Sequence, residues 1–546
     1  MQALTVAIGP AGIEYFARQL VAQELVGALG GLKPPDRSIP VGSFSESGPG
    51  WVNSYSNVRV DLSHGILSGY TPVYQSVKQQ PQGKFLLAMD GRNCTASYDW
   101  RERYHCDHSY SGGGHTKEDV DETYDYKQGI SDLATTVTLG FVYDQKGNDY
   151  AIDVLGSSGQ SSQDKPNIPS QSILHGQSNA CYTTTLSQAT TDSVAAIDFS
   201  TPIAQLLPPL LESIPASGDL GHGIAYEYLL GDAGLTFPQD NGIAIGVTGR
   251  VSYSGQYYSG QTPPVLPVPP VPSSPNHLMF YLSDYEINAL QWAFYQAGLL
   301  NTTVNPDDLP DPDVLKVKTY YPQIPAFKPY TAYAMQAQLT PKAAPVVTFA
   351  QVYRLTKSVM TLLQQQLPAP VYQQILGLDG NAYACVADLE TDLTDAGVAQ
   401  TYWGTIEQAA REMGLVLAQN LEFRLTIQNG AAVLPYLTFD VVRTDILDNL
   451  ALGVSGQAQT LQYGFVHAKY SATFVATNIV NFDQADFGSF IWPVVGEPQY
   501  DKVLVDMGQT GVPLPMMAGF HFLFQQAQVS IQQGYVSVLA QVEYKA

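Results

Sequence analysis

Cysteine and basic residues are both scarce in this chain. Four cysteines among 546 residues are too few for the disulfide framework of a small secreted scaffold. Lysine and arginine number 26 against 49 acidic residues, which gives a formal net charge of −23 at pH 7. A field of that sign repels phosphate backbones and anionic membrane surfaces. The composition therefore argues against nucleic-acid binding.

Long apolar runs and a secretion signal are also missing. No stretch of about 18 consecutive apolar residues occurs, so the sequence predicts no ordinary transmembrane helix. The opening residues 1–6 lack the basic and apolar regions of a secretory signal. We therefore expect either a cytoplasmic protein or one exported without a standard signal, and the sequence leaves this choice open.

The common catalytic motifs are absent as well. The chain contains no Gly-x-Gly-x-x-Gly, no Walker loop for phosphates and no His-Glu-x-x-His. The nearest approach to a nucleophile elbow is 176–180, where Ser178 has a glycine on one side only. We therefore expect no enzyme and no cofactor. A lipid-acting esterase that uses Ser178 is kept as an alternative.

Possible metal ligands gather in two polar segments. Residues 91–130 are rich in Gly, Asp, Tyr and His and predict a long exposed hairpin or loop. Their ligand spacing matches no zinc motif, and the acidic run 305–313 lacks the glycine turn and the bidentate glutamate of a calcium loop. We therefore predict no metal, with incidental histidines in the first segment and a solvated turn in the second. The residues are Cys94, His105, Cys106, Asp107, His108 and His115 in the first segment, and Asp307, Asp308, Asp311 and Asp313 in the second.

The cysteines allow two interpretations. Cys94 and Cys106 are close enough in the sequence for a hairpin disulfide in an oxidising compartment, and the sequence leaves that pairing open. Cys181 and Cys385 are interpreted as buried small apolar residues.

The length and a proline-rich segment predict two domains. A chain of 546 residues exceeds what one hydrophobic core supports, because cores stop growing at roughly 250–300 residues. The prolines of 261–275 fix an extended, stiff segment that we expect to lie along the protein as a strap. The predicted division is a first domain at 1–260, a linker at 261–277 and a second domain at 278–546.

Each predicted domain opens with an amphipathic helix. Residues 13–29 have helical apolar spacing and end at Gly30 and Gly31, which favour a helix stop. Ser283 and Glu286 form a capping-box pattern that predicts the start of the second helix. The apolar faces carry Ile13, Phe16, Ala17, Leu20, Val21, Leu25 and Ala28 in the first helix, and Ile287, Leu290, Ala293, Phe294 and Ala297 in the second.

Most other segments alternate with a period of two, which is typical of antiparallel strands with one buried face. Val58, Val60 and Leu62, for example, alternate with polar residues. An apolar helix predicted over 193–214 contains prolines and should be kinked. A helical block is predicted over 349–419. The further predicted strands are 133–143, 149–154, 223–226, 242–258, 421–427, 434–442, 464–479, 520–531 and 535–544.

This order of elements, with several stretches of sequence, resembles bactericidal/permeability-increasing protein and its relatives in the tubular lipid-binding superfamily. The linker continues into Met279-Phe280-Tyr281-Leu282-Ser283-Asp284-Tyr285-Glu286-Ile287-Asn288 and then 295–300, which is similar to the opening of that family's second domain. Residues 511–515 and 540–545 are similar to its terminal segment. In the first half the resemblance is carried by 12–17 and 223–226 and is fainter.

The resemblance implies an α+β fold and a lipid ligand. The expected shape is an elongated two-domain boomerang, in which each domain is a twisted antiparallel β-barrel wrapped around a long helix. A central sheet joins the domains, and the second carries a helical insertion at about 349–419. The implied function is binding and transfer of a phospholipid or fatty acid in apolar tunnels between helix and barrel, with transient membrane contact. The implied lipid-binding residues are Ile13, Phe16, Ala17, Leu20, Val21, Leu25, Ile287, Leu290 and Phe294.

Two departures from the family keep an alternative open. Residues 1–260 hold 14 basic and 26 acidic residues, so endotoxin binding through a basic first domain is not expected here. The helical block stands where the family continues with strands, and it is interpreted as a partner surface or a tunnel cover. For any single apolar residue, filling the core is the simpler interpretation. The alternative is a non-catalytic interaction or structural protein that keeps the fold and docks a protein partner.

Overall fold

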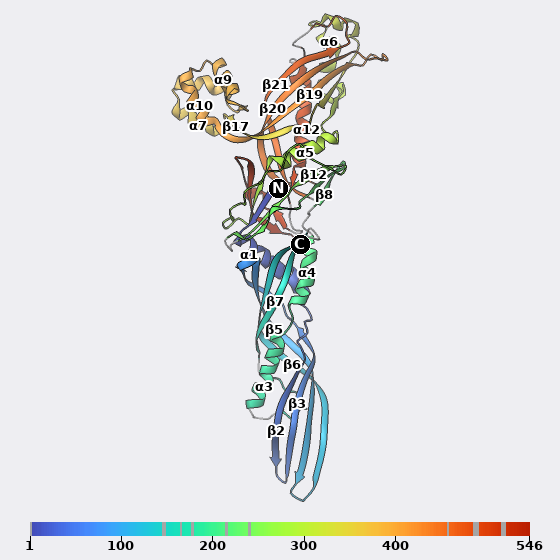
Figure 1. Ribbon diagram of the computed structural model, residues 1–546, viewed down its shortest axis with the longest axis vertical. Coiled ribbons are helices and arrows are strands. Elements are labelled where there is room, and N and C mark those ends of the chain that lie inside the picture. The colour runs from blue at the N-terminus through green and yellow to red at the C-terminus, as the bar shows by residue number, and fades with distance from the viewer. Residues whose placement is uncertain are drawn as a thin grey trace.

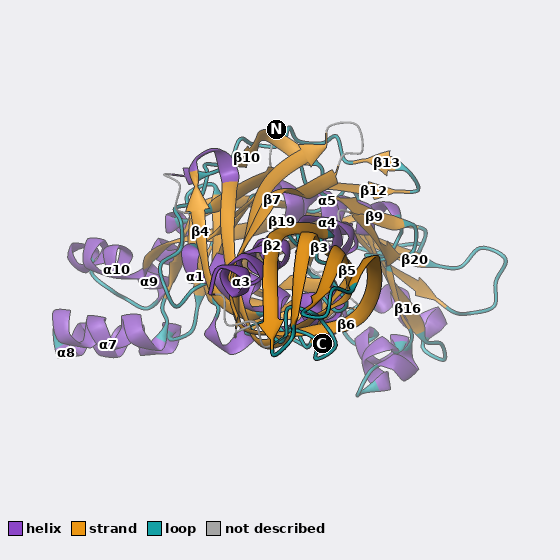
Figure 2. Cartoon of the chain, turned by 90° about the horizontal axis from the view of Figure 1, so that it is seen from below, coloured by secondary structure: helices purple, strands orange, loops and turns teal. Residues whose placement is uncertain are grey.

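The protein is elongated, and its antiparallel sheets follow one another along the long axis (Figure 1). This computed structural model describes residues 3–144, 149–163, 166–175, 180–212, 217–238, 242–455, 458–483, 487, 491–514 and 520–545. The fold is α+β with curled antiparallel sheets, as Figure 2 shows from below. Within the described ranges, no helix is both long enough and apolar enough to cross a membrane.

The first sheet is built around one very long hairpin, β5–β6. Its strands pair from Lys84↔Gly140 to Ser109↔His115, and the sheet order is β2-β3-β5-β6-β7 with β4 paired to β5. Val58, Val60 and Leu62 of β3 are buried, which confirms the alternation predicted there. The bounds are β2 Arg37–Gly48, β3 Trp51–Ser68, β4 Val73–Gln80, β5 Lys84–Tyr110, β6 His115–Asp144 and β7 Asp149–Gln163, with a 3-10 turn at Pro81–Gly83.

The polar segment 91–130 forms the middle and the tip of this hairpin. The hairpin prediction is confirmed, but the segment is exposed on one face only, because Ala96, Tyr98 and Trp100 point into the core with exposed fractions of 0–3%. Cys94 and Cys106 are both free thiols. They lie on the same extended strand, roughly 40 Å apart at about 3.3 Å per residue, so the disulfide that the sequence left open cannot form.

The other cysteines were predicted to be buried. Cys385 is exposed, and its thiol donates to the Asp388 carboxylate over 3.2 Å, so that prediction was wrong. The side chain of Cys181, which lies in α3, is outside the described part of the structure.

Three helical segments pack on the first sheet. The opening helix is continuous from Pro10 to Ala28 and consists of α1 Pro10–Gln19, a π-helical turn η1 at Leu20–Leu25 and α2 Val26–Ala28. The helix predicted over 193–214 is divided into α3 Ala180–Ala195 and α4 Ser200–Glu212. The break precedes Pro202, where the Asp198 carboxylate accepts hydrogen bonds from the backbone N–H groups of Ser200 and Thr201 and so caps α4.

A central sheet connects the two ends of the molecule. Its strand order is β10-β11-β1-β14-β25-β24, so the N-terminal strand lies between a strand of the first half and the strand that opens the second half. A smaller sheet, β13-β12-β9-β8, and the pair β23–β26 lie beside it. The bounds are β1 Leu4–Ile8, β8 Ser217–Gly221, β9 Ile224–Glu227, β10 Leu230–Thr236, β11 Ile243–Val247, β12 Arg250–Tyr253, β13 Gln256–Tyr257, β14 Leu278–Leu282, β23 Phe520–Phe522, β24 Gln528–Gln532, β25 Tyr535–Ala540 and β26 Val542–Tyr544.

The proline-rich linker lies along the central sheet. The Thr5 hydroxyl of β1 donates to the Pro267 carbonyl over 3.2 Å, and the Gly9 N–H donates to the His277 carbonyl over 3.0 Å. A Cβ on Gly9 would stand 2.4 Å from the Pro272 carbonyl oxygen, so only glycine allows this approach. The strap predicted from the prolines is confirmed.

The second sheet is led by three long strands, β19, β20 and β21. Its order is β15-β16-β19-β20-β21-β22, and β17 pairs with the first part of β19. Helix α5, which follows β14, and helix α12 pack on it. The bounds are α5 Asp284–Gln296, β15 Thr302–Val304, β16 Met335–Pro341, β17 Val346–Arg354, β18 Ala382–Tyr383, β19 Arg411–Ile427, β20 Tyr436–Ser455, β21 Ala458–Thr477, η9 Trp492–Gly496, α12 Glu497–Thr510 and β22 Val512–Pro513, with short helical turns at Pro306–Asp308, Pro312–Leu315, Val317–Tyr320, Pro325–Tyr330 and Phe524–Gln526.

The helical insertion is shorter than predicted. Residues 349–354 and 411–419 are strand, because they pair with each other as β17 and the first part of β19. The helices occupy 357–410 and project to one side of the second sheet (Figures 1 and 2). They have their own hydrophobic cluster, to which Leu363, Leu389 and Ile406 contribute. The bounds are α7 Lys357–Gln366, α8 Ala369–Ile375, α9 Val386–Asp395 and α10 Trp403–Ala410, with turns at Leu376–Leu378 and Gln400–Tyr402.

Candidate functional site

The opening helix places its apolar side chains in two directions. Val21 and Leu25 are fully buried in the core of the first sheet. Ile13, Ala17 and Leu20 pack against the same core but remain half-buried. Their helix lies next to strand β4, so these three side chains line the contact between helix and sheet.

Phe16 belongs to the other hydrophobic cluster. Its ring meets the ring of Phe520 edge to face, with 4.6 Å between the centroids, and Tyr15 lies beside them. This pair joins the helix to the C-terminal strands and to the core of the second half. Phe16, predicted as a lipid contact, therefore lies at the joint between the two halves.

Strand β4 supplies the opposite side of the helix–sheet contact. Tyr74 and Val77 are half-buried and pack against the same core as Ile13, Ala17 and Leu20. We call these five residues the helix seam. They share apolar surface that neighbouring protein atoms cover only in part, which is the condition for an apolar ligand to gain by burial.

The edge of the helix seam carries one ion pair. The Arg18 guanidinium stands 5.3 Å from the centre of the Tyr74 ring and pairs with the Glu14 carboxylate over 2.8 Å. Burial, together with the Glu14 charge, raises the pKa of Tyr74. The polar side of the helix thus borders the apolar seam directly.

The second opening helix is packed differently. Ile287, Leu290 and Phe294 are 1%, 0% and 7% exposed, so almost no space of the size of a water molecule adjoins them. The Asn288 amide holds β17 by donating to the Val347 carbonyl over 2.8 Å and accepting from its N–H over 2.6 Å. The predicted lipid contacts of α5 therefore lie inside a filled core.

The capping box predicted at the start of α5 does not form. The Ser283 hydroxyl donates to the Ala3 carbonyl of the N-terminal segment over 3.1 Å and makes no cap bond to α5. Glu286 is fully buried, and burial raises its pKa to about 8. A capping box forms instead within the acidic run, where the Asp308 carboxylate accepts from the Asn305 N–H over 2.7 Å.

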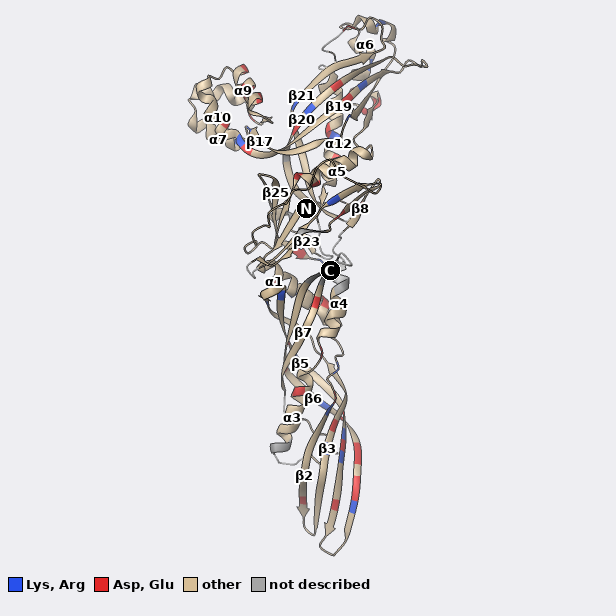
Figure 3. Ribbon diagram, in the orientation of Figure 1, with Lys and Arg blue, Asp and Glu red and all other residues tan. Residues whose placement is uncertain are grey.

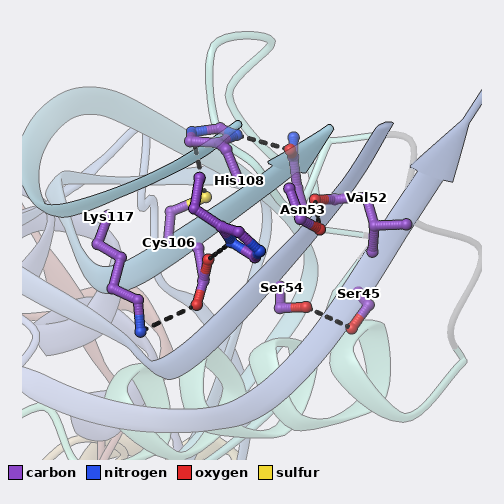
Figure 4. A network of polar contacts seen from close by, with 10 residues as sticks. Ser45, Val52, Asn53, Ser54, Cys106, His108 and Lys117 are labelled. Atoms are coloured by element: carbon purple, nitrogen blue, oxygen red, sulfur yellow. Dashed lines mark hydrogen bonds and ion pairs between the residues drawn. The ribbon is translucent and has the colours of Figure 1, made fainter. Parts of the chain in front are cut away.

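Three possible metal ligands converge near the tip of the first sheet (Figure 4). Cys106 and His108 of β5 point to the same face, and Glu118 lies opposite Cys106 on β6. His108 Nε2 stands 3.4 Å from Cys106 Sγ and 3.2 Å from Glu118 Oε1. Sequence reasoning missed Glu118, because only the hairpin register places it there.

The other ligand types named from the sequence lie elsewhere. His105 and Asp107 alternate with Cys106 and His108 and therefore point to the opposite face, where His105 meets Asp119 and Asp107 meets Lys117. Cys94 is far along β5. The possible nucleophile Ser178 is outside the described residues.

Comparisons with known proteins give a structural likeness and no sequence family. No family model matches the chain, and no curated protein is similar to it at significance. Among solved structures, the chain is similar to a crystal structure of lipopolysaccharide binding protein, with 14% identity, a TM-score of 0.48 and coverage of 100% of this chain and 99% of that one. It is also similar to P47 of Clostridium botulinum E1, with 7% identity, a TM-score of 0.18 and coverage of 99% and 98%. Because both TM-scores are below 0.5, the function has to be inferred from the geometry of the site itself.

Proposed function

We propose that this protein binds a lipid by its acyl chain at the helix seam of the first half, and that it carries the lipid between membranes. The observation that supports this proposal is the half-buried state of Ile13, Ala17 and Leu20 along a continuous helix that faces β4. An acyl chain that covers this surface gains about 0.8 kcal/mol for each CH₂ group removed from water. The proposed ligand is a phospholipid or a fatty acid.

The charge of the protein favours recognition of the apolar part of the lipid. The chain carries a formal charge of −23, and the cation beside the helix seam, Arg18, is already paired with Glu14. An anionic headgroup would have to displace that carboxylate in a repulsive field. We therefore propose that a neutral or zwitterionic headgroup stays in solvent while the chain is buried.

Two substitutions on the same helix test the location of the ligand. Ala17→Trp fills the helix seam and is expected to lower the fraction of lipid-bound protein severalfold, because its indole ring takes the space of the ligand. Ala22→Trp adds the same ring at an exposed position and should leave binding unchanged. Native mass spectrometry, followed by solvent extraction and lipid identification, measures both. Equal lipid occupancy in the two variants would refute the seam as the site.

The helical insertion supports a second candidate function. It has its own hydrophobic cluster and also exposes Leu362 and Leu376, each 42% accessible. A non-catalytic protein that docks a partner through this insertion is favoured if the purified chain has a clean unliganded mass and takes up no added lipid. Loss of partner binding on removal of the insertion would support this alternative.

A further inference from the structure

We propose that the hairpin β5–β6 carries a site for a borderline divalent metal, of which zinc is the model, held by Cys106, His108 and Glu118. Cys106 and His108 are two residues apart on one strand, so both side chains leave the same face. Glu118 pairs directly with Cys106 across the hairpin. One ligand atom from each of the three residues lies within 4.8 Å of the others.

The spacing of the three groups fits a tetrahedral ion without rearrangement of the strands. Zinc binds sulfur at about 2.3 Å and nitrogen or oxygen at about 2.0–2.1 Å, so tetrahedral angles require roughly 3.5 Å between S and N and roughly 3.3 Å between N and O. The observed separations are 3.4 Å from Cys106 Sγ to His108 Nε2 and 3.2 Å from His108 Nε2 to Glu118 Oε1.

The histidine is already oriented for this role. His108 Nδ1 stands 2.6 Å from the Asn53 side-chain oxygen on the adjacent strand β3. Because that oxygen can only accept, the ring proton sits on Nδ1 and the lone pair of Nε2 faces Cys106 and Glu118. The Asn53 amide in turn donates to the Tyr55 hydroxyl over 3.3 Å, so the orienting group is itself held in place.

The donor set selects the class of metal. One thiolate, one imidazole and one carboxylate suit zinc and its neighbours in the transition series, whereas calcium and magnesium take oxygen ligands. Three protein ligands leave a fourth position to water. Acidic residues are frequent along this end of the hairpin (Figure 3), so the local field favours a cation.

A simpler arrangement makes a different prediction. Without a metal, a protonated His108 would form an ion pair with Glu118, whose side chain is 59% exposed, and such a pair contributes about 0–1 kcal/mol. In that arrangement the thiol of Cys106 has no part. Dependence on Cys106 therefore separates a metal site from an ion pair.

The test uses the full-length chain with Cys385→Ser, which removes the exposed thiol. After treatment with a reductant and a chelator, Zn²⁺ is titrated by calorimetry and Co²⁺ by absorption spectroscopy. We expect one equivalent of metal, with a sulfur-to-cobalt charge-transfer band and the visible bands of a tetrahedral ion. Absence of stoichiometric Zn²⁺ binding would overturn the proposal.

Variants with matched controls complete the test. Cys106→Ser and Glu118→Gln should each weaken Zn²⁺ binding by about 100-fold or more, and Asn53→Ala by about 10–100-fold through loss of orientation. His105→Ala and Cys94→Ser, on the same strand, should change it little. Glu118 is exposed, so its variant is expected to fold even if the Cys106 variant does not. Unchanged affinity in Glu118→Gln and Cys106→Ser would show that the metal binds elsewhere and refute the site.

Discussion

Glu286 is a residue whose protonation depends on the fold. Its Oε1 is buried without a hydrogen-bond partner, and a Cβ on the neighbouring Gly249 would lie only 1.2 Å from this atom. Ionising a carboxyl in such a place costs free energy, because the charge loses its hydration. With a pKa of about 8, Glu286 is mostly neutral in the folded protein at pH 7.

The stability of the protein should therefore depend on pH through Glu286. The folded state keeps a proton up to about pH 8, whereas the unfolded chain releases it at its ordinary value of 4.5. Between these two values the unfolding free energy falls as pH rises, by about 1.4 kcal/mol per pH unit, and above pH 8 the full loss persists. Below pH 4.5 this contribution vanishes.

Glu286→Gln removes this ionisable group and should remove the slope. In urea denaturation we expect the variant to be more stable than the unmodified protein at pH 8, and the difference to shrink steadily towards pH 4.5. A difference that is the same at both pH values would show that the carboxyl does not titrate as the structure requires.

At the scale of elements, helix α12 is attached to the second sheet by a buried polar network. Arg443 and Asp445 of β20 are 1% and 0% exposed and form an ion pair of 2.7 Å, and Arg443 also contacts Asp501 of α12. The Tyr500 hydroxyl of the helix donates to Gln419 of β19, whose amide donates to Asp445, each over 2.8 Å. The network satisfies charges that the core would otherwise leave unpaired.

Removing one charge from this network should be costly. Asp445→Asn leaves Arg443 buried without its main counter-ion, and we expect a loss of about 3–5 kcal/mol of unfolding free energy. Asp440→Asn on the same strand breaks an exposed pair with Lys342 and should cost only about 0–1 kcal/mol. Thermal unfolding of both variants tests this contrast, and equal losses would contradict it.

The whole molecule combines coupled and separable parts. The central sheet takes strands from the N-terminus, the middle and the C-terminal region of the chain, so the two ends of the molecule are tied together there. The helical insertion, in contrast, leaves and re-enters the second sheet at neighbouring points, because Tyr353 of β17 pairs with Arg411 of β19. Its apolar residues form a cluster of their own.

The insertion should therefore be removable. Replacing residues 355–409 with an Asn-Gly turn joins β17 to β19 as a two-residue hairpin, which suits the twist of antiparallel strands. We expect a folded protein with unchanged lipid binding, as judged by circular dichroism and native mass spectrometry. An aggregated or unfolded product would mean that the insertion supports the second sheet.

Patterns within one element were predicted well from the sequence. Val58, Val60 and Leu62 alternate in burial as their spacing requires, and the prolines of 261–275 form the expected strap. Contacts between distant segments were not. The carboxyl of Glu286 was expected at a helix cap, but burial of α5 against the small sheet places it beside Gly249.

The sequence by itself determined the elements, because periodicity, prolines and glycines act over a few residues. It also determined the amphipathic opening helix that carries Ile13, Ala17 and Leu20. Only the tertiary structure decided that these three side chains stay half-buried while Leu290 is sealed in a core. It alone brought Glu118 to Cys106 and His108, since strand register is set by pairing over the whole hairpin and cannot be read from ligand spacing along the chain.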